Sequence, residues 1–317
     1  MTLKLLGLSL LLLATFVVWT ALRANVREVR ARTDFPPEGQ FVEVDERRVH
    51  AVVQGNGPDL VLIHGLTGNT RDFTFSLAGQ LAETYRVIIF DRPGLGWSDR
   101  LPRGQEGITD QARHLQAAAT KLGAEQPLVL GQSYGGSVAL AWAVHHPEDI
   151  AGLVTLAAPS HVWDGPLPVF YKITSHPVGA ALVVPLITAF VGAKRVTRAI
   201  EEVFAPQAMP AGYDTHFGAP LSLAREALRA NAQHRVSLKS EIVALQSQYK
   251  NLTLPMEVLH GTADDIVFLS IHAERMVQDT QAAHLTVLEG IGHMPHHVAQ
   301  EDVLAAVGRA AQRAGLR

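Results

Sequence analysis

The sequence contains no cysteine and carries little net charge, and each of these absences excludes a class of function. Without cysteine the chain forms no disulfide, thiol nucleophile or thiolate metal site, but many exported proteins also lack cysteine, so the compartment stays open. The net charge of −3 provides no basic excess to neutralise phosphates, so nucleic acid is not expected as a partner. With 47% hydrophobic and 18% charged residues, the chain has the composition of a globular protein with a substantial core.

An apolar run close to the N-terminus stands apart from the rest of the chain. Residues 5–22 carry no charge and are just long enough to span a bilayer as a helix. No convincing small-x-small cleavage site follows, because Thr20, Leu22 and Arg23 occupy the candidate positions. We therefore expect residues 1–33 to form a single-pass membrane anchor, with export after signal-peptide cleavage as the first alternative and a buried helix as the second. Arginines after the run favour a cytoplasmic location for the remaining chain, although a lysine and the free amine before the run oppose this orientation.

Beyond a proline-containing linker at 34–40, short apolar runs alternate with segments of helical periodicity. Continuous apolar runs indicate strands that are buried on both faces of a parallel sheet. Helices between them predict βαβ units. Residues 41–55 alternate between apolar and polar side chains and predict a hairpin of two edge strands. Further strands are expected at 59–65, 85–91, 127–131, 150–158, 256–261 and 284–290, and helices at 71–84, 108–122, 134–146, 238–250, 269–279 and 297–313.

The alternation breaks over residues 160–237, which we expect to form a helical lid inserted into an α/β core. The core would then consist of residues 34–159 and 238–317. Within the insertion, residues 177–193 are uncharged and contain a proline, which favours a lid helix that lines an apolar pocket over a membrane-dipping surface or a second span. Four aromatic residues of the insertion are candidates for the substrate pocket, although ordinary packing explains each of them as well: Trp163, Phe170, Tyr171 and Phe190.

The strongest chemical signal is the frame Gly131-Gln132-Ser133-Tyr134-Gly135, between a predicted strand and a predicted helix. Its small residues permit a turn so tight that neighbouring backbone passes without a Cβ in the way. A G-x-S-x-G frame in this context is typical of a nucleophile elbow, which lifts the serine hydroxyl clear of the backbone and points helix amides at developing negative charge. A solvated serine in a glycine-rich turn is the alternative.

A nucleophilic serine needs a base, and the base needs a group that orients it. His293 is the candidate base, because it stands at the tip of a glycine-containing turn after the last predicted strand. Asp264 is favoured over Asp265 as the orienting acid from its position after the preceding strand. His296 and His297 are expected at the start of the terminal helix or on the surface. No carboxylate accompanies these histidines at ligand spacing, so no metal site is expected.

With the serine, the acid and the histidine in this chain order, the sequence resembles the α/β-hydrolase superfamily over about residues 40–313. The resemblance rests on the stretches HGLTG, DRPGLGWSDR, GQSYGG, HGTADDIV and GIGHMPHH. It implies the α/β-hydrolase fold and an oxyanion hole formed by the backbone N–H groups of Leu66 and Tyr134. Each such donor is worth on the order of 3 kcal/mol where water is excluded. A serine at the nucleophile position separates the chain from the haloalkane dehalogenases and epoxide hydrolases, which carry an aspartate there.

These observations predict a serine hydrolase that uses no cofactor and cleaves a carboxylester, thioester or lactone in a small lipophilic substrate through an acyl-enzyme. The same triad serves carbon–carbon bond hydrolases and cofactor-free perhydrolases or haloperoxidases, and the fold does not choose among them. A non-catalytic ligand-binding member of the fold is an alternative from another class. The intact triad and both intact glycine-rich turns make this non-catalytic alternative less favoured than an enzyme.

Overall fold

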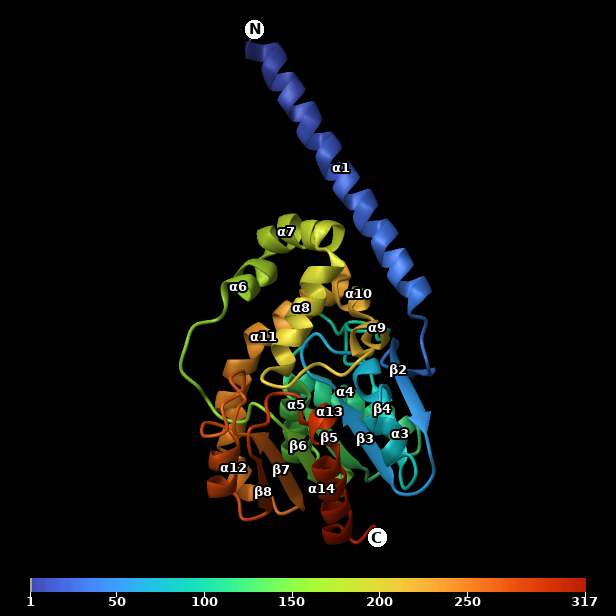
Figure 1. The fold of residues 1–317 in the computed structure, drawn as a ribbon, viewed down its shortest axis with the longest axis vertical. Coiled ribbons are helices and arrows are strands. Elements are labelled where there is room, and N and C mark those ends of the chain that lie inside the picture. Colours follow the sequence, from blue (N-terminus) through green and yellow to red (C-terminus); the bar gives the residue numbers. More distant parts are fainter. Residues whose placement is uncertain (1) are drawn as a thin grey trace.

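The computed structural model describes residues 2–317, and one eight-stranded sheet forms its centre (Figure 1). The strands lie in the order β1-β2-β4-β3-β5-β6-β7-β8. Strand β2 pairs antiparallel with β1 and β4, and the remaining pairings are parallel. The predicted α/β architecture with a mainly parallel sheet is confirmed. The strands are β1 Gln40–Val44, β2 Arg47–Gln54, β3 Asp59–Ile63, β4 Arg86–Phe90, β5 Leu128–Gln132, β6 Gly152–Leu156, β7 Met256–Gly261 and β8 Ala283–Leu288.

Helices cover both faces of the sheet. Successive side chains of a strand point to opposite faces, so a continuously apolar strand presents apolar side chains on both faces, and both must be covered. In β3, Val61 and Ile63 pack with side chains of α4 and α5, whereas Leu60 and Leu62 pack with those of α3 and α14 on the other face. Strands β5, β6 and β7 are buried along their whole length, which explains their continuous apolar sequences. The helices that flank the sheet are α2 Arg71–Thr74, α3 Leu77–Leu81, α4 Ile108–Lys121, α5 Tyr134–His145, α12 Ala273–Asp279, α13 Pro295–Val298 and α14 Gln300–Arg313.

The chain between β6 and β7 forms a helical cap at one end of the sheet (Figure 1). The predicted boundary between lid and core at residues 237 and 238 falls inside α11, so this boundary is wrong. Residues 225–246 contain neither glycine nor proline, and one continuous helix therefore runs from the cap onto the core. The cap helices are α6 Val169–Ser175, α7 Pro177–Phe190, α8 Ala193–Phe204, α9 Tyr213–Phe217, α10 Ala219–Ser222 and α11 Arg225–Gln246.

Two further predictions about local structure need correction. The helix expected at 71–84 is divided into α2 and α3, because Ser76 leaves the helical conformation with φ −156°. The hairpin at 41–55 is present, but only β1 lies at the sheet edge, since β2 also pairs with β4. The hairpin thus extends the parallel sheet by two antiparallel strands.

Helix α1 is continuous from Thr2 to Asp34 and extends away from the rest of the chain (Figure 1). It is long and apolar enough to cross a membrane, with a mean hydropathy of 2.3 over its most apolar window. Its C-terminal part belongs to the packed structure, since Ala24 and Ala31 are buried and Glu28 pairs with Arg225 of α11 at 2.7 Å. The helix therefore joins an apolar half to a half that packs against the cap.

Candidate active site

Ser133 occupies the sharp turn between β5 and α5 with φ 51° and ψ −124°. A non-glycine residue adopts this backbone conformation only when the surroundings enforce it. The flanking glycines are required by close backbone contacts. A Cβ on Gly131 would collide with the carbonyl oxygen of Gly135, and a Cβ on Gly135 with that of Ile63. The predicted tight turn is therefore present, with the serine at its tip.

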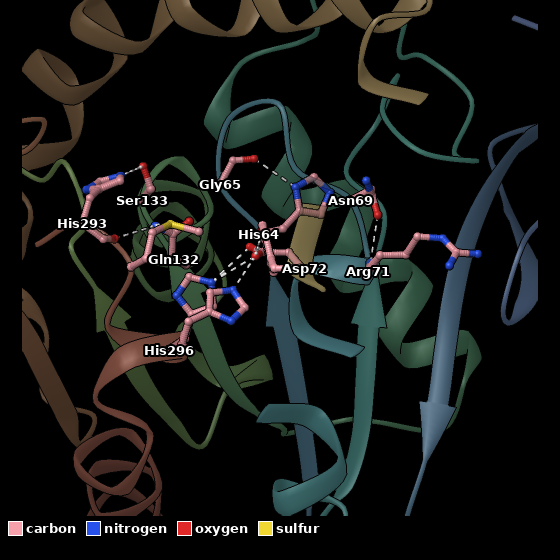
Figure 2. A network of polar contacts seen from close by, with 12 residues as sticks. His64, Gly65, Asn69, Arg71, Asp72, Gln132, Ser133, His293 and His296 are labelled. Carbon is pink, nitrogen blue, oxygen red and sulfur yellow. Dashed lines mark hydrogen bonds and ion pairs between the residues drawn. The ribbon is translucent and has the colours of Figure 1, made fainter. Parts of the chain in front are cut away.

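The structure brings together the three side chains that the sequence proposed as a triad. The Nε2 atom of His293 lies 2.9 Å from Ser133 Oγ, and its Nδ1 atom lies 2.8 Å from Asp264 Oδ2. Figure 2 shows the ring of His293 directed at the Ser133 hydroxyl. All three residues are buried, with Ser133 8% exposed. This geometry allows His293 to take a proton from Ser133 while Asp264 orients the imidazole.

The carboxylate of Asp264 is held firmly on both of its oxygens. Oδ1 accepts hydrogen bonds from the N–H groups of Ile266 at 3.0 Å and Val267 at 2.9 Å, while Oδ2 faces His293. Burial alone would raise the pKa of Asp264, but the hydrogen bonds from His260 and His293 lower this pKa well below its usual range. The neighbouring aspartate at position 265 is exposed, so the structure places Asp264 and not its neighbour on the histidine.

The two amides expected to form an oxyanion hole flank the serine. Tyr134 is the first residue of α5, and Leu66 lines the same cavity as Ser133. Within residues 2–317 neither N–H group has a hydrogen-bond acceptor. Two unpartnered amides at a helix start and an adjoining turn match the requirement for stabilising an oxyanion, and their role remains a prediction.

A buried arginine positions the turn that carries Leu66. Arg92 donates from Nε to the carbonyl oxygen of His64 at 2.9 Å and from Nη2 to that of Gly65 at 2.8 Å. Its backbone N–H also donates to Nε2 of His64 at 3.0 Å. Burial lowers the pKa of Arg92 to about 10, so the guanidinium stays charged at neutral pH. Arg92 belongs to the stretch DRPGLGWSDR, and only the fold shows that its contacts hold this turn.

The structure also reveals a polar cluster that sequence reasoning missed. Asp72 in α2 lies 3.2 Å from Nε2 of His296 (Figure 2). It also lies 2.9 Å from Nε2 of His297 and accepts a hydrogen bond from the Tyr213 hydroxyl at 2.7 Å. Both histidines belong to α13 as expected, but the alternative of a surface position is wrong, because their side chains are at most 1% exposed. No local signal links Asp72 to residues more than 220 positions away.

No carboxylate accompanies His296 and His297 at ligand spacing in the sequence, which argued against a metal site, but the fold brings the carboxylate of Asp72 to them. The ligand atoms of Asp72, His296 and His297 lie within 4.8 Å of one another. Three donors surround the carboxylate, and hydrogen bonds of this kind offset the cost of burying its charge. Burial lowers the pKa of His296 to about 4, so its ring is neutral at pH 7. The described contacts fit a hydrogen-bonded structural cluster, with Asp72 and Tyr213 in the cavity wall.

A cavity of about 830 Å³ lies over Ser133 and His293, and residues of the cap form part of its wall. Apolar side chains dominate its walls, and helices α7, α8 and α9 contribute many of them. Of the four predicted pocket residues, three line it: Phe170, Tyr171 and Phe190. The prediction for Trp163 is wrong, because its ring packs on that of His272 outside the cavity, with 5.9 Å between ring centroids. Trp163 precedes the first cap helix and stays on the sheet side of the insertion.

Comparisons with known proteins agree with this architecture. The family model described as alpha/beta hydrolase fold matches residues 58–174. An uncharacterised protein of Mycobacterium tuberculosis is 27% identical over 285 residues, which cover 88% of this chain and 82% of that protein. Among solved structures, an esterase from Exiguobacterium antarcticum has a TM-score of 0.70 at 21% identity and covers 86% of this chain and 99% of its own.

A solved membrane phospholipase A is similar over almost the whole length of both proteins. It has a TM-score of 0.66 at 21% identity, covering 98% of this chain and 99% of that chain. Likeness at this identity shows a shared fold. Together with the sheet order and the family model matched over residues 58–174, it shows that the chain has the α/β-hydrolase fold.

Proposed function

We propose that this protein is a serine hydrolase that cleaves an ester-like bond (a carboxylester, thioester or lactone) in a small lipophilic substrate. The observation that carries the proposal is the hydrogen-bonded chain from Ser133 through His293 to Asp264 in the wall of an apolar cavity. The esterase and the membrane phospholipase A that share the fold act, by their names, on ester bonds, which supports this reaction class.

The reaction follows from the proton positions in this chain of hydrogen bonds. Ser133 Oγ would attack the acyl carbon while its proton passes to Nε2 of His293, and the resulting oxyanion would lie against the N–H groups of Leu66 and Tyr134. The carbon–oxygen or carbon–sulfur bond then breaks, and the leaving group takes the proton from His293. Water next gives a proton to His293 and attacks the acyl-enzyme, and Ser133 regains its proton as the acid is released.

The shape and polarity of the cavity favour an apolar acyl group as the part of the substrate that is held. A volume of about 830 Å³ accommodates a long chain, and apolar side chains such as Ile200, Val203 and Phe217 dominate its lining. Fully burying each methylene group contributes about 0.8 kcal/mol. We therefore expect substrates with longer acyl groups to have lower KM values until the cavity is filled.

We further propose that α1 anchors the protein in a membrane through its residues 5–22. Support comes from contacts at the end of this run, since Trp19 packs on Phe190 of α7 at 5.1 Å between ring centroids and Arg23 donates to the carbonyl oxygen of Ala189 at 2.8 Å. These contacts between α1 and the cap require that α1 is not removed from the mature chain. Intact-mass measurement of the mature protein and resistance to carbonate extraction test the anchor, and a mature chain that lacks the apolar run would contradict it.

The hydrolase assignment is tested with a fluorophosphonate probe, which reacts with activated serines. The wild-type protein should be labelled, and Ser133→Ala should abolish labelling. Ser137→Ala is the matched control one turn later in α5, because the Ser137 hydroxyl is buried and donates to the carbonyl oxygen of Pro159 at 2.5 Å. Labelling of Ser133→Ala, or no labelling of the wild type, would overturn the assignment.

A further inference from the structure

Helix α7 exposes a continuous apolar stripe on the outside of the cap. Four residues spaced four apart form this stripe, and such spacing places them on one helix face. Their exposed fractions are 59% for Val178, 63% for Leu182, 37% for Leu186 and 38% for Phe190. Val184 and Thr188 on the opposite face are buried, and no charged residue occurs from Pro177 to Ala193. The stripe is therefore an apolar surface that the cap itself leaves uncovered.

Contacts with α1 fix the depth at which this stripe would lie relative to a membrane. Phe190 stacks on Phe16 with 6.2 Å between ring centroids and packs on Trp19. At 1.5 Å per residue, residues 5–22 span about 27 Å, so nearly the whole run must lie in the hydrocarbon core to cross it. Phe16 then lies about 9 Å inside the end of the run, and Trp19 about 4.5 Å inside it. The C-terminal end of α7 is consequently held at the boundary between hydrocarbon and head groups.

The same stripe forms part of the rim of the catalytic cavity. Leu186 and Phe190 line the cavity that contains Ser133, and both are also exposed at the surface. Next to them, Lys194 and Arg195 lie in the first turn of α8 as exposed cations with no ion pair among residues 2–317, and Arg195 also lines the cavity. Apolar side chains with adjacent cations are typical of helices that bind membrane surfaces.

We propose that the α7 stripe inserts into the membrane interface beside α1, so that the cavity receives an acyl-bearing membrane lipid directly from the bilayer. The lipid bilayer is the occupant that fits, because the stripe continues the apolar surface of α1 and lies at the depth where that helix leaves the hydrocarbon. The lipid-substrate part of this inference rests on the proposed hydrolase function, whereas insertion of the stripe does not.

Insertion is tested on the full chain reconstituted in phosphatidylcholine vesicles. Because the chain lacks cysteine, Leu182→Cys can be labelled at a single site with an environment-sensitive fluorophore. Insertion into the bilayer should shift the emission of this label to the blue, and lipids with a nitroxide on the acyl chain should quench it. Val287→Cys is the control, since Val287 is 47% exposed on the edge strand β8, and its label should stay unquenched. Emission from the label at position 182 that is typical of water would overturn the proposal. Blue-shifted emission that nitroxide lipids do not quench would also overturn it, and would indicate contact with another copy of the chain.

The functional consequence is tested by placing charges on the stripe away from the cavity. Val178→Asp with Leu182→Asp should lower the rate on a phospholipid in vesicles by about tenfold, while the rate on a water-soluble short-chain ester stays within about twofold of wild type. Val287→Asp should change neither rate. Equal rates of the double variant and wild type on vesicle lipid would refute lipid entry over α7. Absence of any ester hydrolysis by the wild type would instead refute the proposed function and leave the quenching result to decide insertion.

Discussion

Replacing Asp264 with asparagine should lower kcat/KM by about 10⁴, because asparagine forces the wrong tautomer on His293. The amide oxygen must stay on the N–H groups of Ile266 and Val267, which bind Oδ1 at 3.0 and 2.9 Å. The opposite orientation would set the amide NH₂ against two N–H donors. In the remaining orientation the NH₂ group takes the place of Oδ2, 2.8 Å from Nδ1 of His293.

The consequence for catalysis follows from the single proton of a neutral imidazole. Nδ1 becomes the acceptor of the asparagine amide, so the proton moves to Nε2, and Nε2 no longer accepts the proton of Ser133 at 2.9 Å. A loss of 10⁴ corresponds to about 5.4 kcal/mol of transition-state stabilisation, at 1.36 kcal/mol for each factor of ten. The turn that holds Asp264 keeps its two backbone hydrogen bonds, so the fold should survive.

The assay is steady-state hydrolysis of a water-soluble ester, together with thermal unfolding of each variant. Asp265→Asn is the matched control, because Asp265 is exposed beside the same turn and its replacement should leave kcat/KM within about twofold. An Asp264→Asn variant that folds and retains more than about a tenth of the activity would refute the tautomer argument. A reversed order of the two variants would place the acid one residue later.

Two further predictions concern stability. Gly135→Ala should destabilise the fold by about 1–3 kcal/mol, because its Cβ would collide with the carbonyl oxygens of Ile63 and His64. The control is Gly308→Ala in α14, which meets no neighbouring atom and should be neutral or stabilising. Comparable unfolding temperatures of the two variants would contradict this prediction. Burial lowers the pKa of His64 to about 4 and that of His272 to about 3, so below pH 6.5 the unfolded chain binds protons that the folded chain does not. The free energy of unfolding should therefore fall by about 1.4 kcal/mol per pH unit for each histidine as the pH decreases from about 6.5 towards 4, and urea titrations that give a constant value between pH 7 and 5 would refute it.

The sheet and the nucleophile turn could be predicted because their signals are local. A strand that is buried on both faces has a continuous apolar sequence, as in β5 and β6. The elbow at Ser133 needs small residues wherever backbone passes close by, so Gly131 and Gly135 mark it in the sequence itself. The position of Asp264 after a strand end likewise belongs to a short segment. These features therefore depend on residues within a few positions of one another.

The boundaries of the cap were harder to predict, because helix ends depend on packing as well as on sequence. Helix α11 passes through the expected boundary at 237 and 238 because nothing in residues 225–246 interrupts it. Trp163 lies outside the cavity, although its large aromatic side chain made it a candidate pocket residue. An aromatic side chain packs equally well on the core or in a pocket, and only the path of the chain decides between them.

The sequence by itself determined the mainly parallel sheet, the serine elbow and the apolar run at the N-terminus, because each is a pattern of neighbouring residues. Only the tertiary structure decided which distant side chains meet. Asp72 joins His296 and His297 across the chain, and Phe190 of α7 packs on α1, which places an exposed apolar stripe beside the proposed anchor. Such contacts form between surfaces of elements far apart in sequence, and residue spacing along the chain carries no record of them.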